Sequence, residues 1–334
     1  MLRLRPRGRA LARPLTLALA AFAAAFSLAT PHAAAAVFSP SSVWNAPLGT
    51  NAPLAGSSQS LVAALNRQVA IYKTWINTTT YSTPVYTVPG GQPRVAVKLD
   101  TSAPALAKDF AAVPLPADAR PAAGSDQHLT VYQPSTDTLW EFWLLTKKAD
   151  GWHTRWGGKM DGVSHNPGYF AAPYGATATS LPLLGGLMRT TELAAHQIDH
   201  ALAIAVPDVR ARTFSWPAQR TDGVSSSSTA IPEGTRFRLP ANLNVDALGL
   251  SLAVKAMARA AQQYGLVVRD RAGCVAFYAE DPTPSGINPY RSIFGTPWLD
   301  SNNALKNFPW SSLQVVAPPA RTSAQSGTHA TRRR

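Results

Sequence analysis

The sequence contains little cysteine, and this limits the kinds of site that it can form. Cys274 is the only cysteine among 334 residues. An internal disulfide and a metal site built on paired cysteines are therefore both excluded. Cys274 begins the apolar run Cys274–Ala279, where we expect a buried and unreactive thiol.

Several motifs of nucleotide and metal chemistry are absent as well. The chain has no G-x-S-x-G elbow, no P-loop, no Gly-rich dinucleotide fingerprint and no HExxH. Glu192 and His196 are four residues apart on a predicted short helix, but one His/Glu pair is a weak metal signal. We therefore expect neither a cofactor nor a metal.

Long apolar runs are also scarce, and the most prominent one lies near the start of the chain. Five arginines between Arg3 and Arg13 precede the apolar run Leu15–Ala29, and the small residues Ala33–Ala36 follow. The run is shorter than the roughly 20 residues of a membrane-spanning helix. We expect a signal peptide over residues 1–36, and no membrane attachment after its cleavage.

The positive charge is concentrated at the two ends of the chain. Without the five arginines of the signal segment and four arginines of the tail, the formal net charge falls from +13 to +4. A phosphate-binding patch is not indicated, and nucleic acid is not an expected partner. The expected organisation is one secreted domain over residues 37–318, followed by a disordered basic tail over 319–334.

The pattern of apolar residues predicts an α+β fold, mainly antiparallel and resembling a β-sandwich or jelly roll, with two or three helices. Helices are expected over Ser60–Tyr72, from Thr190, and from about Asp246 to Tyr264. Short strands separated by turn residues are expected at Thr80–Val88, Arg94–Leu99, Trp152–Met160, Ala201–Val206, Arg212–Trp216, Thr235–Leu239, Leu266–Arg269, Gly273–Ala279 and Ser312–Val316.

The segment Asp126–Leu145 predicts a β-hairpin around the loop Pro134–Asp137. Strand side chains alternate between two faces, so Gln133 is opposite Thr138 and Thr130 is opposite Glu141. One face is wholly apolar: Leu129, Val131, Trp140, Phe142 and Leu144. The mixed face carries Asp126, His128, Thr130, Tyr132, Leu139, Glu141 and Trp143, and it is typical of a binding cleft.

Glu141 and His128 are the leading catalytic candidates on the mixed face. Apolar neighbours of Glu141 raise a carboxyl pKa by desolvation, which prepares a general acid. His128 lies diagonally across the hairpin, at roughly 7–8 Å. A half-exposed surface pair is the competing interpretation. Further catalytic candidates are Asp126, Asp161 and His200.

Aromatic and basic side chains supply the candidates for substrate binding. Tyr132 and Trp143 share the mixed face, and the strand Trp152–Met160 alternates Trp152 and Trp156 with His153 and Arg155. Its register is open, so either the tryptophans or the His/Arg pair joins the cleft. Flat aromatic faces suit sugar rings, although aromatic residues also fill cores.

A longer pattern resembles a group of secreted bacterial proteins of unassigned function. It runs from D-x-H (Asp126, His128) and Glu141 through GATATSLPLLGGL (Gly175–Leu187), Glu192, I-x-HAL (Ile198–Leu202), WPA (Trp216–Ala218) and PEGTRFRL (Pro232–Leu239) to YGLVVRD (Tyr264–Asp270). The resemblance implies a single domain and supplies no catalytic residues.

These features favour a secreted carbohydrate-active enzyme that acts on a polysaccharide or cell-wall glycan. A glycosidase would pair Glu141 with Asp126 or Asp161. A polysaccharide lyase would use His128 or His200 as the base, with Tyr132 and Arg155. The alternatives are a non-catalytic glycan-binding protein and a metal-dependent hydrolase. The last requires that His128, Glu141 and His200 converge on one point.

Overall fold

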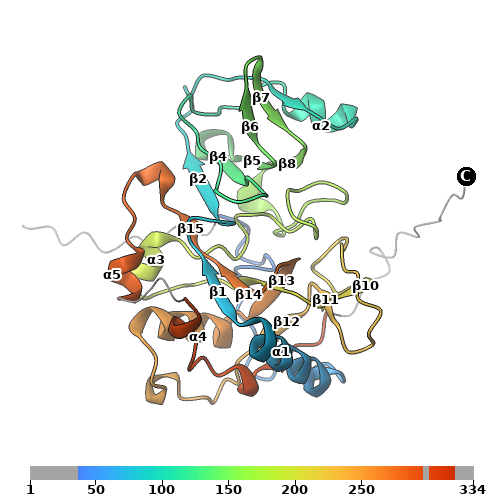
Figure 1. Ribbon diagram of the computed structural model, residues 1–334, viewed down its shortest axis with the longest axis vertical. Coiled ribbons are helices and arrows are strands. Elements are labelled where there is room, and N and C mark those ends of the chain that lie inside the picture. Colours follow the sequence, from blue (N-terminus) through green and yellow to red (C-terminus); the bar gives the residue numbers. More distant parts are fainter. Residues whose placement is uncertain (1–36, 296–300, 320–334) are drawn as a thin grey trace, which may run out of the picture. The chain divides into compact units, whose positions relative to one another are not determined.

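The computed structural model describes residues 37–295 and 301–319 (Figure 1). The expected signal peptide, and all but the first residue of the expected tail, lie outside these ranges. Within them, no helix combines the length and the apolar character needed to cross a membrane.

The fold is α+β, and most of its regular structure is sheet. The three helices expected from the sequence are present as α1 (Ser58–Tyr72), α3 (Thr190–Ala195) and α4 (Leu252–Gln263). α4 begins six residues after the predicted start at Asp246, which lies in a separate short turn. Ser251 caps α4 because its side chain accepts a hydrogen bond from the Val254 N–H. Shorter helices are α2 (Pro104–Asp109), α5 (Tyr290–Phe294) and α6 (Ser301–Ala304).

The helices α1 and α4 pack in one hydrophobic core with a six-stranded sheet. Its order is β1 (Thr74–Asn77), β14 (Val275–Tyr278), β9 (Leu202–Val206), β13 (Leu266–Arg271), β12 (Arg236–Arg238) and β16 (Gln314–Val315). The pairing is mixed, since β9 is parallel to β13 and antiparallel to β14. Leu65, Val254 and Met257 of the two helices pack with Leu202 and Ile204 of β9.

The predicted hairpin lies in a five-stranded sheet. The order is β15 (Glu280–Asp281), β2 (Thr83–Thr87), β4 (Leu129–Gln133), β5 (Thr138–Trp143) and β8 (Trp156–Asp161). Figure 1 shows β4, β5 and β8 side by side. The predicted register is confirmed, because Gln133 pairs with Thr138 and Thr130 pairs with Glu141.

Two smaller sheets complete the regular structure. One has the order β3 (Val97–Leu99), β7 (Gly151–Thr154) and β6 (Thr146–Lys148). The other pairs β10 (Val209–Phe214) with β11 (Ile231–Glu233). The predicted strand Trp152–Met160 is thus divided between β7 and β8. The division falls where the Arg155 N–H and the Thr154 hydroxyl both donate to the Trp143 carbonyl.

Both faces of the hairpin are covered along most of its length. Leu129, Val131, Trp140 and Phe142 lie in an apolar core, as the alternation predicted. The mixed face differs from the expectation of an open cleft, because Thr130, Leu139 and Glu141 on it are each 0% exposed. Only the end of the hairpin with Asp126, His128 and Trp143 borders a cavity.

Close packing of β8 against β5 requires glycine at position 157. A Cβ on Gly157 would lie 2.0 Å from the Glu141 carbonyl oxygen. We expect Gly157→Ala to lower the free energy of unfolding by about 3 kcal/mol or more, because the backbone of one strand must shift. Urea denaturation measures the change. Gly249→Ala is the matched control, since nothing lies within 4 Å of its Cβ position. Equal stability of the two variants would contradict the packing argument.

Candidate functional site

A cleft of about 1090 Å³ could hold a ligand. Side chains from both large sheets and from the loops beside them line it. Five are Trp or Tyr: Trp75, Tyr81, Trp143, Trp156 and Tyr278. The charged or titratable lining residues include Asp126, His128, Arg155, Arg220, Asp222, Asp270 and Arg271. We call this cavity the cleft.

Half of the candidate residues from the sequence line the cleft, and half do not. The cleft is bordered by Asp126, His128, Trp143, Arg155 and Trp156. The residues that are not among its lining side chains are Tyr132, Glu141, Trp152, Asp161 and His200. The residues that line the cleft lie at the end of the hairpin away from its loop and at the start of β8.

Glu141 is buried beneath the segment Gly175–Leu187, which we call the 175–187 loop. Its Oε1 accepts a hydrogen bond from the Ala176 N–H and its Oε2 accepts one from the Leu183 N–H, each at 2.7 Å. Burial raises the pKa of Glu141 to about 7, and these two donors act in the opposite direction. With both oxygens occupied, Glu141 holds the loop and does not face the cleft.

Two arginines hold the same loop through its carbonyl groups. Nη1 of Arg269 donates to the oxygens of Leu183 at 2.7 Å and Gly185 at 3.0 Å. Nη2 of Arg220 donates to the Thr177 oxygen at 2.6 Å, and its Nε donates to the Ser180 hydroxyl at 3.0 Å. Arg269 is almost completely buried, so its hydrogen bonds replace those it would make with water.

His200 lies in a separate ion pair. Its Nε2 is 3.1 Å from Oε2 of Glu192, and its Nδ1 is 2.8 Å from the Ala201 carbonyl oxygen. Burial alone would lower the pKa of His200, but the Glu192 carboxylate outweighs it and the pKa is raised. His200 thus ties α3 to the start of β9.

The remaining three candidates, Trp152, Tyr132 and Asp161, lie in a core or at the surface and not in the cleft. Trp152 packs in the apolar core of the hairpin. Tyr132 packs, partly buried, against the core that contains Leu139. Asp161 is exposed at the surface, where Lys159 is 2.9 Å from one of its oxygens.

His128 is the candidate whose surroundings remain compatible with chemistry in the cleft. The side chain is 6% exposed and borders the cavity. Burial, with the nearby Arg269 charge, lowers the pKa of His128 to about 3. The imidazole is therefore neutral at pH 7, and it is a weaker base than an exposed histidine.

The aromatic residues of the cleft are held by polar and stacking contacts. The Trp156 Nε1–H donates to the Pro173 oxygen at 3.0 Å, and its ring stacks on Tyr174 with 6.3 Å between centroids. The Arg155 guanidinium lies 6.0 Å from the centroid of the Trp143 ring. Burial raises the pKa of Asp126 on the neighbouring wall.

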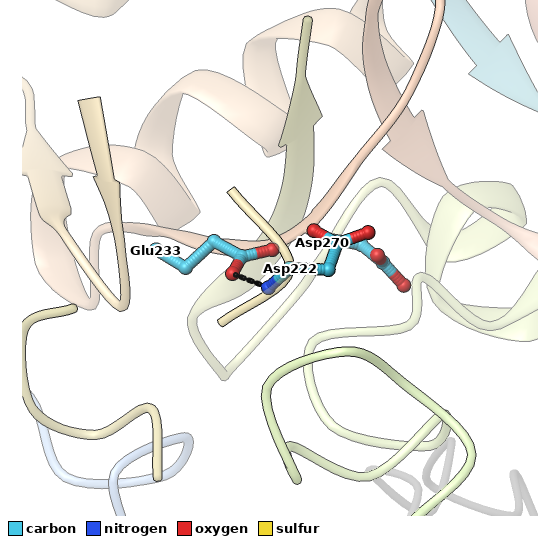
Figure 2. A group of neighbouring side chains, drawn as sticks. All are labelled: Asp222, Glu233 and Asp270. Carbon is cyan, nitrogen blue, oxygen red and sulfur yellow. Dashed lines mark hydrogen bonds between the residues drawn. The ribbon is translucent and has the colours of Figure 1, made fainter. Parts of the chain in front are cut away.

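The structure adds three carboxyl groups that the sequence analysis missed. Asp222, Glu233 and Asp270 each offer an oxygen, and these atoms lie within 4.8 Å of one another (Figure 2). Burial raises the pKa of Asp270 to about 7 and that of Glu233 to about 8. We call these residues the carboxyl cluster. A usable signal was that Asp270 directly follows the predicted strand Leu266–Arg269 and that Asp222 precedes a glycine.

The metal site proposed from His128, Glu141 and His200 does not form. Both oxygens of Glu141 bind the loop, and His200 binds Glu192. Among the residues described, the carboxyl cluster is the one set of His, Cys, Asp or Glu side chains with metal-binding spacing.

No family model, curated protein or solved structure matches the chain in comparisons with known proteins. The resemblance to secreted bacterial proteins therefore stays a prediction.

The role of Glu141 can be tested through stability. Glu141→Leu leaves the N–H groups of Ala176 and Leu183 without an acceptor, so we expect a loss of about 2–6 kcal/mol in the free energy of unfolding. Glu141→Gln keeps one acceptor and should lose less. Urea denaturation measures both. The exposed Asp161→Asn serves as control and should change stability by less than about 0.5 kcal/mol. Wild-type stability of Glu141→Leu would refute the role.

The His200–Glu192 pair predicts a pH dependence of stability. Because the folded-state pKa of His200 is raised, its contribution is complete below the unfolded-state pKa of about 6.5 and is lost as the pH rises through the folded value. His200→Gln should therefore cost more stability at pH 6 than at pH 9. Denaturation at both pH values measures this, with His165→Gln, an exposed histidine, as control. An equal loss of stability in His200→Gln at both pH values would contradict the prediction.

Proposed function

We propose that this protein is a secreted enzyme that cleaves an acidic polysaccharide in the cleft. The observation that carries the proposal is the lining of the cleft, which combines five Trp and Tyr side chains with His128, arginines and carboxyl groups. Cavities that bind small or linear ligands commonly have such a largely apolar wall with a few polar groups. The signal-like first segment supports export.

Aromatic rings suit a carbohydrate substrate. Trp75 and Tyr81 are each 42% exposed, although large aromatic side chains are usually covered. Together with Trp143 and Trp156 they present flat apolar surfaces along one cavity. The C–H faces of sugar rings can pack on such surfaces, while the hydroxyl groups reach the charged residues between them.

Two arginines with accessible guanidinium groups favour a glycan that carries carboxylates, while the formal charges of three arginines and three aspartates in the lining balance. Arg155 and Arg271 line the cavity, and each is at least partly open to solvent. A guanidinium binds a carboxylate through two parallel hydrogen bonds. Arg220 lines the cleft too, but its donors are directed to the 175–187 loop.

The reaction that these groups support best is elimination at a uronate. Neutralising the carboxylate makes the neighbouring C–H acidic, and the neutral imidazole of His128 takes that proton. The electron pair of the C–H bond forms a C=C bond, the C–O bond to the next sugar breaks, and the leaving oxygen takes a proton. A bound carboxylate would also raise the pKa of His128, which makes it a stronger base. Tyr278 lines the same cavity and can donate its own phenolic proton to the leaving oxygen. The proton held by His128 then passes to the tyrosinate through solvent, which restores both residues.

One observation favours hydrolysis as a second candidate. Carboxyl oxygens of Asp222 and Asp270 lie within 4.8 Å of one another, and burial raises the pKa of Asp270 to about 7. Retaining glycosidases place two carboxyl groups about 5–5.5 Å apart, and the acid of the pair has a raised pKa.

A panel of acidic and neutral polysaccharides tests the proposal. Reducing ends and the ultraviolet absorbance of unsaturated uronates are measured in parallel. We expect both signals on an acidic polysaccharide. Reducing ends without absorbance would favour hydrolysis. Binding without either product would overturn the enzyme proposal and leave a glycan-binding protein.

Two substitutions test the assigned roles on the substrate that the panel identifies. His128→Ala should lower kcat about 10²–10⁴-fold, because it removes the base. Trp143→Ala should mainly raise KM, because it removes a stacking surface. Asp161→Asn, outside the cleft, is the control. A wild-type rate of His128→Ala, with its fold intact by circular dichroism, would remove His128 from the mechanism.

A further inference from the structure

The carboxyl cluster is assembled from three separate segments of the chain. Asp222 lies in the loop between β10 and β11, Glu233 is the last residue of β11, and Asp270 lies in β13. Asp222 and Asp270 line the cleft. Figure 2 shows the Glu233 carboxyl group directed toward the other two residues.

Glu233 has a buried oxygen without a partner among the described residues. Its side chain is 0% exposed. Oε2 accepts a hydrogen bond from the Asp222 N–H at 3.3 Å, whereas Oε1 has no hydrogen-bond partner. Leaving a buried acceptor unsatisfied costs about 1–3 kcal/mol, and more for a charged group. A positive partner at this point would remove that cost.

Arg220 and Arg269 interact with the cluster through their charges, but neither forms a hydrogen bond with the free Glu233 oxygen. Arg271 reaches only Asp222, at 3.6 Å, and both side chains are more than 40% exposed. Exposed pairs of this kind contribute little. Arg220, the other cationic side chain lining this part of the cleft, directs its hydrogen bonds to Gly175, Thr177 and Ser180.

We propose that Asp222, Glu233 and Asp270 bind one hard divalent cation, with Ca²⁺ as the preferred ion. The three ligand atoms would all be carboxylate oxygens, which are the ligands that hard cations such as Ca²⁺ prefer. Ca²⁺–oxygen bonds are about 2.3–2.6 Å long, so two ligands on opposite sides of the ion are roughly 4.6–5.2 Å apart. Oxygens within 4.8 Å of one another can therefore share one ion.

The position of the site gives the ion a role in the proposed reaction, and this role rests on the proposed function. Three side-chain ligands leave coordination positions for water or substrate, because Ca²⁺ takes six to eight oxygens. Since Asp222 and Asp270 line the cleft, a uronate carboxylate can occupy one of those positions. The ion then neutralises that carboxylate and makes the adjacent C–H more acidic. Asp222 and Asp270 would in that case act as ligands, which favours elimination over hydrolysis.

Calorimetry on the chelator-treated full chain with CaCl₂ tests the site without any glycan, so it is independent of the proposed function. We expect saturable binding by the wild type and an increase of Tm with Ca²⁺. Asp222→Asn and Glu233→Gln should each weaken binding about tenfold or more, because each removes a ligand charge. Asp222 is exposed, so its variant should fold. Asp161→Asn, another exposed aspartate, should bind like the wild type.

Two results would overturn the site: no heat and no Tm shift for the wild type at millimolar Ca²⁺, or wild-type affinity of both cluster variants. Chelation during the polysaccharide assay tests the role of the ion separately. If calorimetry shows Ca²⁺ binding but the enzyme stays active after the ion has been chelated, the catalytic role is refuted and the binding site is not.

Discussion

Two buried ionic side chains hold the 175–187 loop, and the arrangement of the cleft depends on this contact. Glu141, from the five-stranded sheet, accepts from two N–H groups of the loop, and Arg269, from the six-stranded sheet, donates to its carbonyl groups. Backbone N–H groups satisfy both oxygens of Glu141, and backbone carbonyl groups satisfy Nη1 of Arg269, whereas Nε of Arg269 has no hydrogen-bond partner. The loop is thereby fixed to both sheets, and removing either side chain would leave buried backbone groups unpaired.

Fixing the loop also determines where the cleft can open. The loop covers the middle of the hairpin's mixed face, so Glu141 is shielded from solvent. Residues 176–178 of the same loop border the cleft beside His128. The polar end of the hairpin therefore meets Asp222 and Asp270 across one cavity. The proposed chemistry follows from this meeting of His128, arginines and the carboxyl cluster.

Local patterning predicted much of the fold and part of the site. Alternation with period two fixed the β4–β5 register and the apolar face with Leu129 and Phe142, and helical spacing located α1 and α4. The site predictions placed Asp126 and His128 at the cleft. Glu141 was wrongly predicted to face the cleft, because a period-two pattern assigns a residue to a face of the strand but does not show what covers that face.

The sequence alone therefore determined most of the strands, the register of the hairpin and most of its apolar core, since these depend on neighbours within a few residues. Leu144 was predicted in that core, but the core contains Leu145 instead. Only the tertiary structure decided which polar residues border the cleft and which hold a loop. The carboxyl cluster shows the reason. Asp222, Glu233 and Asp270 lie on three segments, and no local period relates them. Their meeting follows from the packing of β11 beside β13, which depends on contacts between distant parts of the chain.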